Sequence, residues 1–321
     1  MFYKDKKILI TGGTGFIGTN FVQALLSQGA KIRIPIHKRK PIITHRNIEA
    51  IPVDLNKQED SLKVCEGINY VIHAAGSVGS SVIGVNKMMA SITENLTLTA
   101  LMLQSAWYKG VERFLLFGSS TAYPIADYPI KEEELWSNPP YSGYFGYGWM
   151  RRYLERLGEF VHQQSDMKIA LARPTAVYGC YDNFDLASCH VIPALISRSL
   201  KKENPFIVWG TGKEVRDFLH ISDFVTGCLL LLEKHAECDP VNIGYGEGVT
   251  IKELVSIILR LTDHKDVRVE YRSPNSSSAI PFRIVDTDKS KKLLGFKPAI
   301  TLEKGILNTI DWYVDSQNNK S

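Results

Sequence analysis

The first half of the chain alternates short apolar runs with longer amphipathic stretches. Five runs rich in Ile, Val and Phe have the length of buried strands: Lys7–Ile10, Lys31–Ile36, Glu49–Val53, Tyr70–Ala74 and Arg113–Phe117. Between the first two runs, Ile17, Phe21 and Leu25 recur at helical spacing, and Gly29 stands where a C-cap glycine is expected. Repeated strand–helix units predict an α/β fold of the Rossmann type, with helices on both faces of a doubly wound parallel sheet.

A sixth unit, with a helix near Tyr147–Gln164 and a strand at Lys168–Arg173, precedes a change of pattern after Pro174. Later elements are shorter, with a polar loop at 273–278 and a helical pattern again near Leu302–Tyr313. We expect a nucleotide-binding domain over 1–175, to which the chain returns near 215–247 because Val241–Gly244 resembles a further strand. Residues 176–214 and 248–321 are expected to form a smaller α/β substrate lobe.

Composition excludes several classes of protein. Of 321 residues, 44% are apolar and 22% charged, which suits a packed core and not a disordered chain. The net charge of +4 is not gathered in a basic block, so we expect no nucleic-acid partner. The five cysteines are scattered without a C-x-x-C pair, which favours reduced thiols and no metal site. Without an apolar run of signal-peptide or transmembrane length, we expect a cytoplasmic protein and no membrane contact.

A glycine-rich turn directly follows the first predicted strand and directly precedes the first predicted helix. It contains Gly12, Gly13, Thr14, Gly15, Phe16, Ile17 and Gly18, which satisfy both G-x-x-G-x-x-G and G-x-G-x-x-G. Glycines let the backbone approach a pyrophosphate, which then sits against the free N–H groups of the helix. In this strand–turn–helix context, dinucleotide binding is favoured over a simple flexible turn.

The end of the second strand indicates which dinucleotide binds. An acidic residue there favours NAD, whereas this chain has His37, Lys38 and Arg39, followed by Lys40. A cationic cluster suits the 2′-phosphate of NADP, so we prefer NADP and keep NAD and a merely solvated loop as alternatives. Two further groups are placed for the dinucleotide by their position after strands: Asp54 and Leu55 for the adenine, and Ala74, Ala75 and Gly76 beside the pyrophosphate.

Candidate catalytic side chains follow the fifth strand, where open α/β sheets bind ligands. Ser119 comes directly after it, and Tyr147 and Arg151 share one face of the next helix at i and i+4. A fixed cation stabilises a phenolate, so Tyr147 could exchange a proton with a sugar hydroxyl or ketone while Ser119 binds the same oxygen. Taken singly, Tyr-x-x-x-Arg is also common on helix surfaces without a function, and a serine pair after a strand is often only a helix cap or a turn.

From Lys7 to Tyr313 the chain resembles the extended short-chain dehydrogenase/reductase family of nucleotide-sugar epimerases, dehydratases and reductases. The resemblance is carried by TGGTGFIG (11–18), HAAG (73–76), GSSTAYP (118–124), the Tyr147-x-x-x-Arg151 helix, RPTAVYG (173–179) and RDFLHISD (216–223). Segments 181–184 and 190–195, with Val208-Trp209-Gly210 and Arg216, are similar to the GDP-L-fucose synthase branch of that family.

The resemblance implies roles for residues throughout the chain. It implies a catalytic trio of Ser119, Tyr147 and the cation at 151, with Asn95 in support and Pro174 near the dinucleotide. It also implies a nucleoside-diphosphate site formed by Asn183, Val191, Leu195, Arg198, Val208, Trp209, Arg216 and Arg283. Trp209 could instead be a core aromatic residue of the lobe, and Arg198 a solvated helix residue.

Two positions depart from the family pattern. The family's lysine is Arg151 here, which keeps the charge but is planar and never neutral. The fucose synthases place a cysteine at Thr121, paired with the histidine that matches His190, to move protons at the sugar carbons. Threonine ionises poorly, so dehydration and double epimerisation are disfavoured, unless Cys189 substitutes.

Three functions stay open at this point. The leading hypothesis is an oxidoreductase acting at C4 of the hexose, most plausibly reducing a GDP-4-keto-6-deoxyhexose with NADPH. The second is a C4 epimerase or dehydrogenase that retains its nicotinamide cofactor, and the third is a non-catalytic dinucleotide-binding sensor or scaffold. The family resemblance implies a homodimer joined through two helices per subunit, around Leu96–Tyr108 and Tyr147–Phe160.

Overall fold

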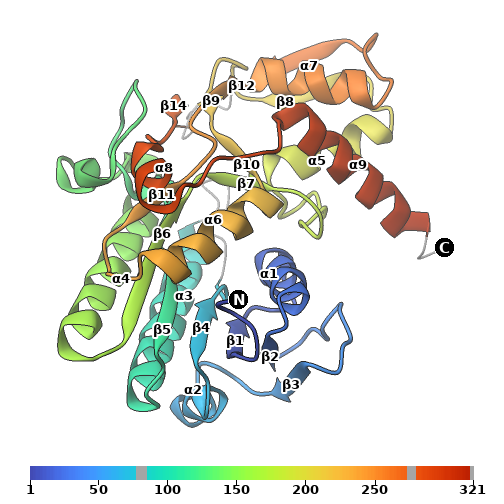
Figure 1. The fold of residues 1–321 in the computed structure, drawn as a ribbon. Coiled ribbons are helices and arrows are strands. Elements are labelled where there is room, and N and C mark those ends of the chain that lie inside the picture. Colours follow the sequence, from blue (N-terminus) through green and yellow to red (C-terminus); the bar gives the residue numbers. More distant parts are fainter. Residues whose placement is uncertain (77–84, 273–279, 319–321) are drawn as a thin grey trace.

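The centre of the molecule is a seven-stranded parallel sheet (Figure 1). A computed structural model describes residues 1–76, 85–272 and 280–318. The strand order is β11-β6-β5-β4-β1-β2-β3. The bounds are β1 Lys7–Thr11, β2 Lys31–Ile36, β3 Ile48–Pro52, β4 Tyr70–His73, β5 Arg113–Phe117, β6 Lys168–Pro174 and β11 Val241–Ile243. The order reverses at β1, so the carboxyl ends of β1 and β4 flank the crevice in which such sheets bind ligands.

The apolar runs predicted the strands closely. β2 and β5 have the predicted bounds, and the other three of the first five strands differ by one residue at one or both ends. β11 pairs in parallel with β6, with Val241 opposite Ala172 and Ile243 opposite Pro174. The late segment therefore does return to the main sheet. The predicted polar loop at 273–278 lies outside the described residues.

Helices cover both faces of the sheet and bury two separate apolar cores. Helices α1 (Phe16–Ser27) and α6 (Ile221–Lys234) pack on one face. Helices α2 (Gln58–Cys65), α3 (Val85–Tyr108) and α4 (Phe145–Gln164) lie on the other face. Gly29 follows α1 with φ +79°, and the N–H of Ala30 donates to Leu25, as expected for a helix that ends in a left-handed residue.

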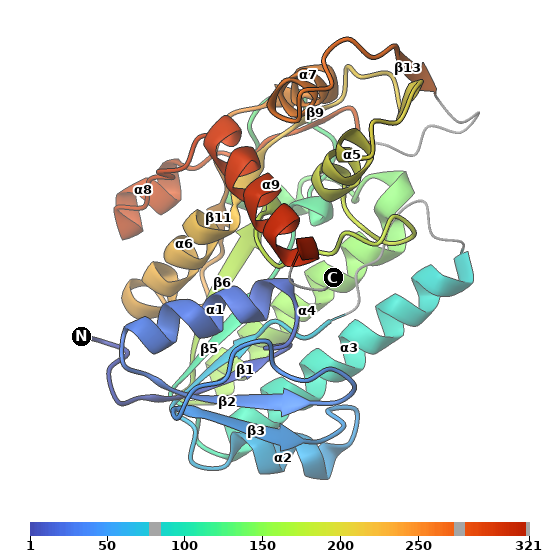
Figure 2. The ribbon, with the colours of Figure 1, turned by 90° about the vertical axis from the view of Figure 1, so that its right-hand side faces the viewer.

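A third apolar core belongs to the lobe at the top of Figure 1, which Figure 2 shows from the side. Its helices are α5 (Val191–Leu200), α7 (Ile251–Leu261) and α9 (Leu302–Asn318), with α8 (Asp288–Leu294) packed nearer α6. Its strands form three small sheets: β7 (Ala176–Tyr178) with β10 (Phe218–His220), β8 (Phe206–Trp209) with β13 (Val269–Arg272), and β9 (Val215–Arg216) between β12 (Val249–Thr250) and β14 (Phe282–Arg283). The lobe therefore has an apolar core of its own, apart from the two cores on the faces of the seven-stranded sheet.

One loop ties the two parts together directly. The side chain of Asn20 on α1 donates to the carbonyl of Cys180 (3.0 Å), and Gln23 donates to the hydroxyl of Tyr181 (3.0 Å). The ring of Tyr181 in turn contacts Trp312 on α9. The first helix of the sheet domain and the last helix of the lobe therefore share one connection. Among the described residues, no helix has both the length and the apolar character needed to cross a membrane.

Candidate active site

Two glycines, Gly12 in the turn between β1 and α1 and Gly18 in α1, leave no room for a side chain. Gly12 has φ +67°, and a Cβ there would lie 2.6 Å from the carbonyl oxygen of Ala74. A Cβ on Gly18 would lie 2.2 Å from the carbonyl oxygen of Gly12, so α1 packs directly on the turn. No side chain of the described residues caps the N-terminus of α1 at Gly15, and its first N–H groups can meet a phosphate. The turn therefore fits the pyrophosphate of a dinucleotide.

Other predicted dinucleotide residues gather beside this turn. Thr14, Phe16 and Ile17 belong to it, and Ala74, Ala75 and Gly76 follow β4 next to Gly12. A Cβ on Gly76 would lie 2.5 Å from Oδ1 of Asn95, which brings α3 against this segment. Pro174 is the last residue of β6, two strands from β4 in the sheet.

A buried histidine holds the ends of β1 and β4 together. His73 Nδ1 is 2.9 Å from the hydroxyl of Thr11, and its Nε2 is 3.1 Å from the hydroxyl of Thr99 on α3. The N–H of Ala75 donates to the same Thr11 hydroxyl (3.0 Å). Burial, assisted by the charge of Arg151, lowers the pKa of His73 to about 3, so this histidine is neutral at physiological pH.

The cationic segment after β2 is open to solvent. His37, Lys38 and Arg39 are exposed, and within the described part of the chain Lys38 and Arg39 have no hydrogen bond or ion pair. Asp54 follows β3, where bonds from Asn56 lower the pKa of its carboxyl, and Leu55 is 8% exposed. Lys38 and Arg39 are thus available to bind a ligand phosphate.

Ser119 and Thr121 form one hydroxyl pair at the carboxyl end of β5. Their side-chain oxygens are 2.7 Å apart, and the Ser119 oxygen accepts from the backbone N–H of Thr121 (3.2 Å). Ser119 thereby caps the short 3₁₀ helix Ser120–Ala122. Its two roles are compatible because a hydroxyl can accept one bond and donate another.

Tyr147 and Arg151 meet on one face of α4. The guanidinium of Arg151 donates to the Tyr147 hydroxyl from Nη2 (2.6 Å) and Nε (3.1 Å), and to the carbonyl of Phe117 at the end of β5 (3.3 Å). On the same helix, a Cβ on Gly148 would lie 3.3 Å from the carbonyl oxygen of Thr121. The helix with Tyr147 and the turn with Ser119 are therefore in direct contact.

Two arginines lie side by side in the lobe. Arg216 of β9 is in register with Arg283 of β14, and neither forms an ion pair with a carboxylate in the described residues. Burial, with the neighbouring charge of Arg283, lowers the pKa of Arg216 to about 10, and burial lowers the pKa of Arg283 too. The phenol of Tyr144, just before α4, interacts with Arg283. The charges of Glu214 and Asp217 act on Arg216 and Arg283, respectively, but form no ion pair with them in the described residues. Two partly desolvated cations that are not paired in this way are suited to bind a diphosphate.

The other residues predicted to bind substrate in the lobe differ in how accessible they are to a ligand. Leu195 and Val208 are 3% and 2% exposed within the lobe core. Arg198 is bound by Glu203 (2.6 Å) and by the carbonyl of Ile207 (2.6 Å), so it is not a solvated helix residue. Trp209 is 70% exposed, which excludes the core aromatic alternative. Direct contact of Leu195, Val208 and Arg198 with substrate stays a prediction without support from this geometry.

His190 lies just before α5, beside a buried carboxylate. Its Nδ1 is 3.5 Å from Oδ1 of Asp182, and Asp182 raises the pKa of His190. Asn183 is exposed and donates to Ser188 (2.9 Å), while Val191, the first residue of α5, is 38% exposed. Burial raises the pKa of the Cys189 thiol, which makes it a weaker proton shuttle than a free cysteine.

Comparisons with known proteins identify the family of this chain. Residues 8–244 match the model of the NAD dependent epimerase/dehydratase family. The chain belongs to that family. GDP-L-fucose synthase 1 of Arabidopsis thaliana is 29% identical over 99% of this chain and 96% of its own length. UDP-glucose 4-epimerase of Thermotoga maritima, solved with UDP-glucose, has a TM-score of 0.86 at 25% identity, covering 97% of this chain and 99% of its own. MoeE5, solved with UDP-glucuronic acid and NAD, has a TM-score of 0.84 at 25% identity over 97% and 99%.

Membership makes this chain an extended short-chain dehydrogenase/reductase, a class of NAD(P)-dependent enzymes that act on nucleotide sugars. Within the described residues, no three His, Cys, Asp or Glu side chains gather in a way that could hold a metal ion. Sequence reasoning missed His73 and Tyr144 at this site. The signal for His73 was its place at the head of the HAAG segment (73–76), and the signal for Tyr144 was its place directly before α4.

Proposed function

We propose that this protein reduces the 4-keto group of a GDP-4-keto-6-deoxyhexose with NADPH. The observation that carries the proposal is the contact of the Arg151 guanidinium with the Tyr147 hydroxyl, next to the Ser119 hydroxyl and the end of β5. A proton donor and a second hydrogen-bond donor at that edge of the sheet suit the reduction of a carbonyl.

In the proposed reaction, the dinucleotide, when bound at the glycine turn, would supply the hydride for C4 of the sugar. Tyr147 donates its proton to the C4 oxygen as the carbonyl is reduced, and Ser119 holds that oxygen by a hydrogen bond. The two N–H groups of Arg151 then stabilise the phenolate that Tyr147 leaves behind. Solvent returns the proton to Tyr147 before the next turnover.

The preference for NADPH rests on the cations Lys38 and Arg39, which have no hydrogen bond or ion pair with any residue that the structure describes. Both can make charge-assisted hydrogen bonds to a 2′-phosphate, whereas no acidic residue is present at 37–40 to accept from the ribose hydroxyls of NAD. The preference for a GDP-linked sugar is carried over from the relatives. Arg216 and Arg283 are suited to its diphosphate, and the exposed indole of Trp209 to its base.

Thr121 argues against epimerisation at the neighbouring carbons. Its hydroxyl is bonded to Ser119, and a threonine hydroxyl is a poor acid or base near neutral pH. We therefore expect reduction without deuterium incorporation at C3 or C5 when the reaction runs in deuterated water. Deuterium at either carbon would show that epimerase chemistry survives despite Thr121, and His190, beside Asp182, would then be the first residue to substitute.

The decisive experiment follows NADPH oxidation with a GDP-4-keto-6-deoxyhexose and identifies the sugar product. Tyr147→Phe should abolish turnover while NADPH still binds, and Tyr153→Phe, on the exposed face of the same helix, should leave turnover unchanged. Conversion of a UDP- or GDP-hexose without net NADPH consumption, by protein purified with a fluorescent reduced nicotinamide, would instead favour the C4 epimerase. That alternative is supported by the likeness to UDP-glucose 4-epimerase.

We also propose a homodimer formed through α3 and α4. The outer face of α4 exposes Phe145, Trp149, Tyr153 and Phe160, which is a large apolar area for a helix that faces water. Met89 and Tyr108 of α3 are exposed as well, and the two helices pack against each other. A second copy of the same pair of helices would cover this surface as a symmetric interface.

A further inference from the structure

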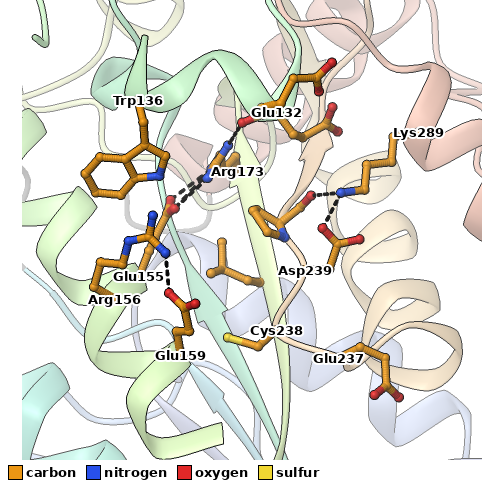
Figure 3. A pocket seen from close by; sticks show the side chains of 13 residues that line it. Glu132, Trp136, Glu155, Arg156, Glu159, Arg173, Glu237, Cys238, Asp239 and Lys289 are labelled. Atoms are coloured by element: carbon orange, nitrogen blue, oxygen red, sulfur yellow. Dashed lines mark hydrogen bonds and ion pairs between the residues drawn. The ribbon is translucent and has the colours of Figure 1, made fainter. Parts of the chain in front are cut away.

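A buried ion pair lies directly behind the turn that carries Ser119. Arg173 of β6 and Glu155 of α4 are 2% and 5% exposed, and the guanidinium binds the carboxylate through Nη2 (2.7 Å) and Nε (3.0 Å). Although burial disfavours its charge, Glu155 and Tyr123 keep the pKa of Arg173 above its ordinary value. The pair lines a cavity of about 410 Å³. Figure 3 shows Trp136 and Arg156 alongside the pair. The catalytic steps derived above do not use this pair.

Gly118, the residue before Ser119, rests on the pair. A Cβ on Gly118 would lie 2.3 Å from Oε1 of Glu155 and 3.0 Å from Cγ of Arg173. The Gly118 N–H donates to the carbonyl of Ala172 (2.8 Å), so its backbone cannot move away without losing a hydrogen bond. The position of Ser119 is therefore set by how tightly Glu155 is held.

The other donors of Arg173 hold the far end of the same turn. Its Nη1 donates to the hydroxyl of Tyr123 (2.9 Å) and to the carbonyl of Glu132 (2.7 Å). The Tyr123 hydroxyl then donates to Asn242 of β11 (2.7 Å). One side chain thus fixes both Gly118 and Tyr123, the two residues that flank the Ser119–Thr121 hydroxyl pair.

Glu155 also belongs to the helix that carries the catalytic tyrosine. It follows Tyr147 by eight residues and Arg151 by four, so all three share one face of α4. The carboxylate therefore links the tyrosine helix to the serine turn through Arg173. We propose that Glu155 and Arg173 are a positioning pair that sets the placement of Ser119 relative to Tyr147 during carbonyl reduction.

This inference rests on the proposed function, and its test separates the two. The first variant is Glu155→Gln, which keeps the shape but removes the charge that balances Arg173. Since a displacement of about 1 Å can cost about a hundredfold in rate, we expect kcat to fall about tenfold to a hundredfold. The KM for the nucleotide sugar should change less than about twofold, because the pair touches no ligand.

Glu159→Gln is the matched control. Glu159 lies one turn further along α4 and lines the same cavity, but its partner is the half-exposed Arg156. A general effect of losing a carboxylate from this helix would appear in both variants. Positioning predicts normal kcat and KM for Glu159→Gln.

A second pair of variants tests the contact with Gly118. Gly118→Ala should lower kcat because its methyl group collides with the Glu155 carboxylate. Glu155→Asp shortens that side chain by one methylene, so the double variant Gly118→Ala/Glu155→Asp should recover part of the activity lost in Gly118→Ala. A purely additive loss in the double variant would contradict the proposed contact.

Hydrogen–deuterium exchange of the amides in 118–123 gives a readout that needs no substrate. Glu155→Gln should speed this exchange about tenfold at a temperature where circular dichroism shows a folded protein, and Glu159→Gln should not. If the wild-type protein reduces no 4-keto sugar, the proposed function is wrong. The exchange measurement still shows whether Glu155 and Arg173 hold the segment 118–123 in place. Unchanged exchange or an unchanged kcat in folded Glu155→Gln overturns the inference.

Discussion

The guanidinium of Arg151 donates two hydrogen bonds to the hydroxyl of Tyr147, from Nη2 at 2.6 Å and from Nε at 3.1 Å. A lysine, as in the family pattern, has one compact ammonium group and cannot reproduce this fork. In this chain the cation therefore contacts the Tyr147 hydroxyl itself through two N–H groups, and at the same time binds the carbonyl of Phe117.

Substitution of Arg151 should separate charge from geometry. Arg151→Lys keeps the charge but loses one of the two bonds, so kcat should fall less than about tenfold. Arg151→Met removes the charge-assisted bonds, worth about 1.5–3 kcal/mol each, so kcat should fall about a hundredfold or more. Both values come from initial rates at saturating NADPH. A lysine variant much faster than the wild type would mean that Arg151 marks a degenerate site.

Removal of the cations at the end of β2 should change dinucleotide preference. The double variant Lys38→Ala/Arg39→Ala should raise the KM for NADPH about tenfold or more and leave the KM for NADH nearly unchanged, since only NADPH has the 2′-phosphate. Lys201→Ala removes an exposed charge from the lobe and serves as the control. Equal effects on both dinucleotides would argue against a phosphate contact at this segment.

His73 should make stability depend on pH in acid. Its pKa is lowered from about 6.5 to about 3 by burial, so between these values the unfolded chain binds the proton and the folded chain does not. The free energy of unfolding therefore falls as pH drops below 6.5, by up to about 1.4 kcal/mol per pH unit. Burial raises the pKa of Asp217 to about 6, which gives a slope of opposite sign between about pH 6 and 4.

Urea denaturation of wild type and His73→Asn at several pH values isolates the histidine, because Asp217 is present in both. The free energy of unfolding should fall less in acid for His73→Asn than for the wild type, and the difference is the contribution of His73. The exposed His45 provides a control, since His45→Asn should follow the wild-type curve. Parallel curves for wild type and His73→Asn would contradict a neutral buried histidine.

The exposed aromatic face of α4 should be the dimer interface. Tyr153, 59% exposed, lies between Trp149 and Phe160, and an arginine there would place a charge in the interface of two copies. Tyr153→Arg should be monomeric by light scattering, whereas Ile125→Arg, at an exposed position outside α3 and α4, should keep the wild-type mass. A wild-type protein that is monomeric at tens of micromolar would overturn this assignment.

The sequence predicted well whatever depends on local pattern. Strand runs such as Lys31–Ile36 and the glycine turn are local, because side-chain periodicity and backbone freedom decide them. The sequence could not show that Arg198 is bound by Glu203, because this depends on how the chain turns after α5. Nor could it show that Leu195 faces the lobe core, because this depends on how distant elements pack. The Glu155–Arg173 pair was missed for the same reason. Only the fold brings this helix and this strand together.

Gly12 and Gly18 limit where the dinucleotide site of this chain can change. A Cβ would lie 2.6 Å from a backbone oxygen at Gly12 and 2.2 Å from one at Gly18. We therefore expect neither glycine to tolerate substitution, whether by mutation in nature or by design. The solvent-exposed residues 37–40 have no such constraint. A change of preference between NADP and NAD, whether in nature or in the laboratory, is therefore expected to arise from substitutions at 37–40, while the glycine turn stays unchanged.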